Sequence, residues 1–113
     1  MKKKETSVEN ALICGLDETA IDALKAEHGF LILGTVKQGG DVFHVIFKEP
    51  STKVLKAIET VEKTDKLQAS INMFNNCMVK CDDEIRDRDY LKIRSVESVV
   101  KHMQSFSVEV KNL

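Results

Sequence analysis

Two short runs rich in β-branched and aromatic residues, separated by a pair of glycines, constrain the fold of this chain most. The runs cover residues 30–36 and 42–47, and Gly39 and Gly40 lie between them. Because glycine adopts positive φ at little cost, the pattern predicts a β-hairpin over residues 30–48. A two-stranded hairpin is only marginally stable in water, so its apolar face must pack against helices or against the strands of another copy.

Helical periodicity on both sides of the hairpin supplies such helices. Asp17 is placed as an N-cap and Gly29 as a stop, while Pro50 ends the second strand and is tolerated in the first turn of a helix. Apolar residues recur at three- and four-residue steps over four ranges: 18–28, 50–62, 66–79 and 88–108. We therefore expect an α+β fold, with an N-terminal helix, one antiparallel β-hairpin, then three α-helices packed on it.

Length and charge exclude several classes of protein. The 113 residues suffice for a single domain, which we expect over residues 17–113 after a flexible basic tail over 1–16. Apolar types make up 42% of the chain and charged types 31%, as in ordinary globular domains. The formal net charge of −1 gives no long-range attraction to nucleic acid or an anionic membrane. No stretch reaches the roughly 18 apolar residues of a membrane span. We therefore expect no nucleic-acid and no membrane partner.

Cysteine usage and the N-terminal sequence both favour the cytoplasm. Three widely spaced cysteines cannot form a closed disulfide framework, which predicts free thiols in a reducing compartment. The lysines at 2–4 suggest the start of an export signal. However, Glu5 and Glu9 interrupt the apolar stretch that such a signal needs.

The cysteines also raise the question of a metal site. Cys77 and Cys81 are four residues apart and could seed a site with Cys14 or His102. Structural zinc sites usually show two close pairs, and this sequence has no second pair. Cys77 lies on an apolar stripe and fits a core position better. We expect no metal and no cofactor, and a small metal-binding or hydrolytic enzyme built on these residues is the least favoured alternative.

No other group of residues predicts catalysis. His28, His44 and His102 are scattered and form no nucleophile-and-base pattern. The acidic run over residues 82–89 lacks the spacing and the glycine of a calcium loop, and acids of this kind are favoured ahead of a helix. We therefore expect that the protein is not an enzyme.

The order of short motifs resembles a known group of proteins. The motifs are Phe47-Lys48-Glu49-Pro50, Thr64-Asp65-Lys66, Asn75-Asn76-Cys77, Asp82-Asp83-Glu84-Ile85, residues 87–91, and Glu109-Val110-Lys111-Asn112-Leu113. Over roughly residues 35–113 the chain is similar to small proteins of phages and prophages of gut bacteria, of the Bacteroides type, that look like phage tail assembly chaperones. The resemblance implies a non-enzymatic role in which many copies coat the tape-measure protein and hand it to the tail-tube protein in the cytoplasm of the bacterial host.

This reading predicts a partner-binding surface on the hairpin and the last helix. The candidate contact residues are Val99, Met103 and Phe106 from the helix, and Phe43 and Val45 from the hairpin. We expect protein partners, namely the tape-measure protein and the tail-tube protein, together with self-association. The alternative is a small regulatory or antitoxin-like protein that binds its partner through the C-terminal helix.

Overall fold

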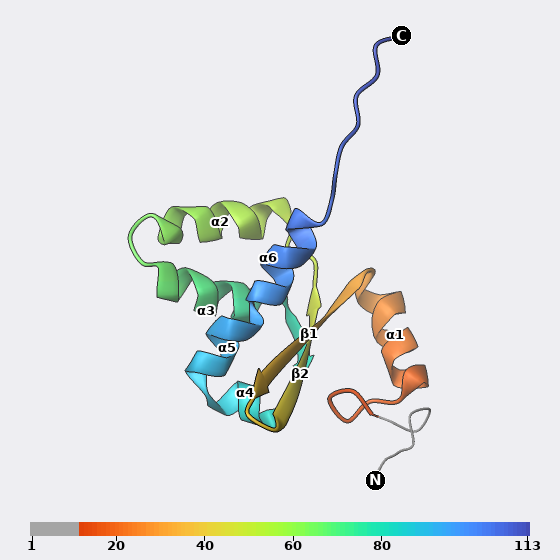
Figure 1. Cartoon of the computed structure of the whole chain (residues 1–113), viewed down its shortest axis with the longest axis vertical. Coiled ribbons are helices and arrows are strands. Elements are labelled where there is room, and N and C mark those ends of the chain that lie inside the picture. Colours follow the sequence, from red (N-terminus) through yellow and green to blue (C-terminus); the bar gives the residue numbers. More distant parts are fainter. Residues whose placement is uncertain (1–11) are drawn as a thin grey trace.

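A three-stranded antiparallel sheet with helices on both faces forms the structure, a computed structural model that describes residues 12–113 (Figure 1). The elements are α1 (Glu18–His28), β1 (Leu31–Gln38), β2 (Asp41–Lys48), α2 (Thr52–Glu62), α3 (Lys66–Cys77), β3 (Met78–Cys81), α4 (Asp83–Asp87), α5 (Asp89–Ser95) and α6 (Glu97–Gln104). The predicted α+β class and the hairpin are confirmed. Most of the predicted basic tail lies in residues 1–11, outside the described residues.

Side-chain caps set the starts of three helices. Asp17 and Asp65 each accept a hydrogen bond from the backbone N–H three residues further on, at 2.9 and 3.0 Å. Asp17 was the predicted cap of α1. Helix α2 begins at Thr52, two residues later than predicted, because the hydroxyl of Ser51 provides its cap and Pro50 stays outside the helix.

The third strand was missed by the sequence pattern. We expected a helix up to residue 79 followed by a connection, but α3 ends at Cys77 and Met78 has extended backbone angles. Strand β3 pairs with β2, with Cys81 opposite Val45. Four residues are too few for a clear period-2 pattern, so the pairing with β2 determines the strand conformation.

The predicted single helix over residues 88–108 is wrong. It is divided into α5 and α6 at Val96, it stops at Gln104, and α4 precedes it. The valines of this region have low helix propensity, so the helical conformation persists only where apolar side chains pack into the core. Leu91 and Val99 do so, with exposed fractions of 3% and 0%. Residues 105–113 find no such packing and are exposed.

The main core lies between the sheet and helices α3 to α6. Alternate residues of the hairpin face it, and Phe47 and Phe74 are both almost fully buried, with their rings edge to face at 5.9 Å. Gly34 allows α6 to approach β1 closely, because a Cβ at this position would lie 2.5 Å from Oγ of Ser98. The close approach fixes the position of α6 beside the first strand.

Helix α1 and the turn that precedes it lie on the opposite side of the sheet from the other helices (Figure 1) and leave Leu33 on that face half-exposed. Ile13 and Leu16 exchange two backbone hydrogen bonds, and Cys14 between them is buried. The predicted boundary of the flexible tail at residue 16 is therefore too far along the chain, because residues 13–16 already pack on the domain. No residue of α1 itself is buried, so this helix is held less firmly than those on the other face.

Candidate protein-binding groove

Three of the five predicted contact residues lie in the core. Val45 and Val99 are fully buried and Phe43 is 8% exposed, so they hold the helices on the sheet and offer no surface to a partner. Their prediction as contact residues is wrong, because the chain's own helices cover the apolar face of the hairpin. The same burial leaves little of the apolar face of α6 for a toxin or repressor. Met103 is half-buried, and Phe106 is 66% exposed.

The outer edge of β1 carries a row of outward-pointing backbone groups. A two-residue loop joins Gln38 to Asp41, so these two residues form a hydrogen-bonded pair, and such pairs alternate along the hairpin. The N–H and C=O groups that point away from β2 belong to the intervening residues: Leu31, Leu33, Thr35 and Lys37. Within residues 12–113 no hydrogen bond is made by these groups.

The backbone of His44 supports this assignment of direction. His44 lies opposite Thr35, and its carbonyl accepts the N–H of Asp82 at 3.0 Å on the β3 side. Its own N–H donates to Oδ2 of Asp82 at 2.6 Å. Both backbone groups of His44 therefore bond on the side away from β1. In such an antiparallel pair the opposite residue, Thr35, also directs its N–H and C=O away from its partner, towards the outer edge of β1.

A groove of about 490 Å³ runs along this edge, between β1 and the helices α5 and α6. Residues 35–38 all line it, and since consecutive strand residues face opposite sides, a hollow that touches all four follows the edge of the strand. Leu91 and Ser98 lie on the helical wall. The groove is therefore placed where an added strand would lie.

The walls of the groove are mainly cationic. Among the described residues, Glu97 is the one carboxylate that lines it, and its Oε2 forms an ion pair with Nε of Arg94 at 3.2 Å. Arg88 donates to the side-chain oxygen of Gln38, also at 3.2 Å. The four cationic side chains are Lys37, Arg88, Arg94 and Lys101. This imbalance attracts acidic side chains, in a manner that salt weakens.

The other side of the same strand edge is apolar. A hollow of about 230 Å³ lies between α1 and the sheet, with Ile13, Ile21 and Ile46 among its lining residues. Leu33 also lines it and is 50% exposed. A strand added to β1 would therefore meet Arg88, Arg94 and Lys101 on its helical side and, beside Leu31 and Leu33, apolar surface on the α1 side.

The C-terminal segment, residues 106–113, begins beside the start of β1. The ring of His102 stacks on Phe30 at 5.1 Å and meets Phe106 edge to face at the same distance. Nε2 of His102 also lies 2.6 Å from Oε2 of Glu49. Beyond Phe106 the chain projects from the body of the molecule (Figure 1), and every residue from 107 to 113 is exposed.

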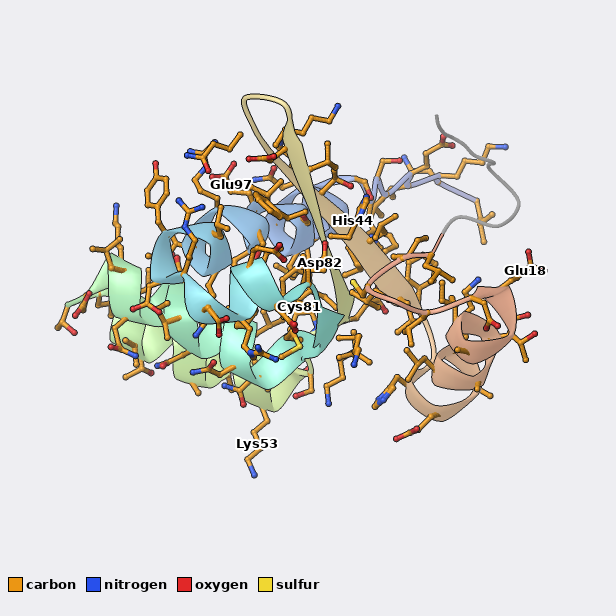
Figure 2. All side chains as sticks on the ribbon, turned by 90° about the horizontal axis from the view of Figure 1, so that it is seen from below. Glu18, His44, Lys53, Cys81, Asp82 and Glu97 are labelled. Carbon is orange, nitrogen blue, oxygen red and sulfur yellow. The ribbon has the colours of Figure 1, made fainter. Side chains whose placement is uncertain are left out.

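The thiols are poorly suited to nucleophilic chemistry. Burial, with help from the nearby Asp82 carboxylate, raises the pKa of Cys14 to about 12, and burial raises the pKa of Cys77 and Cys81. Cys81, Asp82 and His44 lie close together (Figure 2), but Asp82 bonds the backbone of His44 and does not orient its imidazole. Among residues 12–113, no three His, Cys, Asp or Glu residues are grouped to hold a metal ion.

The groove was not found by sequence reasoning. Its available signal was the recurrence of Arg94, Glu97 and Lys101 on one face of the predicted last helix, which also fits an ordinary solvated surface. No helix in the described part of the chain is long and apolar enough to cross a membrane. Comparison with protein-family models, with curated proteins and with solved structures found no match.

Proposed function

We propose that this chain is a non-enzymatic protein-binding module that takes an extended segment of another protein along the outer edge of β1. The supporting observation is the row of outward backbone groups from Leu31 to Lys37, which the groove borders at Thr35 and Lys37. An added strand pairs with these groups, and its side chains alternate between the cationic wall and the apolar hollow. The preferred segment therefore alternates acidic and apolar residues.

The resemblance to tail assembly chaperones suggests the biological partner. We propose the tape-measure protein as the partner, held in the cytoplasm of the bacterial host and then passed to the tail-tube protein. Main-chain pairing supports such a role, because it depends little on the partner's sequence and allows many copies to bind one long chain. The alternating side-chain pockets then decide which segments are occupied.

A peptide array tests this function. The proposal expects a gene for a tape-measure protein in the same genome, and its product is divided into overlapping peptides of about 15 residues, longer than a typical strand. The array is probed with the full chain under reducing conditions at moderate salt. We expect the bound peptides to alternate apolar and acidic residues. We also expect their affinity to fall as salt rises, because the cationic wall is exposed to solvent.

Two variants and one matched control connect binding to the groove. Thr35→Pro removes an outward N–H without touching the β1–β2 ladder and should abolish binding. Arg94→Glu reverses a wall charge and should weaken it about tenfold, or about 1.4 kcal/mol. Lys53→Glu makes the same change of charge on exposed α2, far from Glu97 of the groove (Figure 2), and should bind normally.

Two results would contradict the proposal. One is an array on which no peptide is bound, or on which Thr35→Pro binds as the wild type does. The other is equal binding of a single-stranded oligonucleotide that is insensitive to Thr35→Pro, since the groove would then respond to polyanions through charge alone.

A further inference from the structure

From Phe106 to Val110, the C-terminal segment of this chain has the alternation that the groove selects. Phe106, Val108 and Val110 alternate with Ser107, Glu109 and Lys111, so an extended segment carries apolar residues on one face and polar residues, among them one carboxylate and one ammonium group, on the other. Val108 and Val110 are 87% and 88% exposed, so nothing in the described part of the chain, residues 12–113, buries these two valines. We propose that residues 106–113 of one copy add as an antiparallel strand to the β1 edge of a second copy.

The proposal rests on the groove described under the proposed function and names one occupant for it. Residues 106–113 match β1 in length, since both contain eight residues. At about 3.3 Å per residue, eight extended residues span roughly 26 Å, the length of the whole edge. The segment can therefore pair with all four outward residues of β1 without leaving part of the edge open.

The register follows from where charge and apolar surface lie. Residues that sit opposite each other in a sheet share a face, and Leu33 and Thr35 face the α1 side. Pairing Val110 with Leu33 and Val108 with Thr35 places both valines on that apolar side. Glu109, opposite Gly34, then lies on the helical side of the sheet, towards Arg94 and Lys101. Lys111 is opposite Ile32, beyond the residues of β1 that line the groove. A slip of one residue would exchange the two faces and lose both matches.

The direction of α6 indicates a second copy as the acceptor. Ser98 lies against Gly34 and His102 against Phe30, so α6 runs antiparallel to β1 and the chain leaves it beyond the start of the strand. To reach its own edge, the segment would have to reverse at Ser105. There, the N–H and hydroxyl of Ser105 both donate to the carbonyl of His102, at 3.1 and 2.6 Å, and Phe106 packs on the His102 ring. These contacts direct the segment outward.

The test uses two full-length variants that block opposite halves of the contact. Thr35→Pro leaves the segment intact but closes the edge, and Val108→Lys with Val110→Lys leaves the edge intact but alters the segment. Sedimentation equilibrium at about 100 µM detects association with a Kd near 10 µM. We expect the wild type to associate and each variant alone to sediment as a monomer of about 12.7 kDa. An equimolar mixture should regain association, because each variant supplies what the other lacks.

Controls separate loss of contact from loss of fold. Each variant should retain the wild-type circular dichroism spectrum. If Thr35→Pro unfolds, Leu33→Lys replaces it, because this half-exposed side chain tolerates a charge in the monomer and opposes the valines of the segment. Glu109→Lys should weaken association about tenfold, whereas Lys53→Glu should not change it.

Three outcomes would overturn the inference. They are a monomeric wild type at this concentration, association that survives the valine substitutions or the blocked edge, and a mixture that stays monomeric while the wild type associates. None of these outcomes contradicts the proposed function, because that function is tested separately by the binding of tape-measure peptides. Conversely, the chain could associate through this segment while no peptide on the array is bound. That result would support this inference and exclude the tape-measure protein as the partner.

Discussion

The substitution Phe74→Ala measures how much of the fold depends on the contact between α3 and the sheet. Phe74 is 2% exposed, and its ring meets Phe47 edge to face at 5.9 Å with Nζ of Lys92 5.6 Å from its centre. Truncation to Ala removes on the order of 130 Å² of buried apolar surface, or about 3 kcal/mol at 25 cal/mol per Å². The lost aromatic pair adds about 0.5–1.5 kcal/mol. We expect a total loss of about 3–5 kcal/mol, in the range of core Phe→Ala changes.

The assay is urea unfolding at 25 °C, followed by circular dichroism. The midpoint should fall while the slope stays the same, because the surface exposed on unfolding hardly changes. Leu67→Ala is the matched control on the same helix. The spacing of Leu67 from Ile71 and Phe74 in the sequence predicts that it lies on the apolar face of α3, but it is 64% exposed, so its loss should cost less than about 1 kcal/mol. Equal costs at the two positions, or a cost below about 1 kcal/mol for Phe74→Ala, would refute the orientation of α3.

The remaining predictions concern the positions that hold the rest of the fold. Gly34→Ala should cost about 1–2 kcal/mol in the free energy of unfolding, because its Cβ meets Ser98, and Ser98→Ala should recover part of that cost. Asp82→Ala should cost about 1–2 kcal/mol, measured in the same way, because it leaves the N–H of His44 without its acceptor. At pH 8 the thiol of Cys14, with its pKa of about 12 against the ordinary 9.0, should react with iodoacetamide about a thousandfold more slowly than a free thiol. Since the native pKa of this thiol is the higher one, its contribution to stability is complete below pH 9 and is lost as pH rises towards 12, which pH-dependent unfolding will show.

The proposed contact gives a role to two surface features that would otherwise favour aggregation, namely the open edge of β1 and the exposed C-terminal segment. An open strand edge is a site of uncontrolled pairing, and an exposed segment with alternating valines is prone to form such pairs. If the segment of one copy occupies the edge of the next, each feature protects the other. A partner with a better match to the groove would then displace the segment, so self-association and partner binding would compete for one site.

Local chemistry was enough to predict the early elements of this fold. The glycine pair fixes the hairpin because few other residues adopt positive φ, and Gly39 does have φ of 60°. Asp17 and Asp65 cap their helices through bonds to residues three positions away. Such interactions are contained within a few neighbouring residues, and a sequence pattern therefore shows them directly.

Only the tertiary structure decided the third strand, the division of the last helix and the location of the groove. The conformation of β3 depends on pairing with β2, some 35 residues earlier in the chain. The division of the predicted last helix into α5 and α6 at Val96 depends on how its apolar side chains pack into the core. The groove brings Lys37 together with Arg94 and Lys101 from distant segments. Periodicity identifies which residues of an element are apolar, but packing determines which of them are covered. The pattern therefore identified apolar residues such as Val99 correctly, but only packing showed that they are buried inside this chain, which leaves the strand edge as the surface that we propose for a partner.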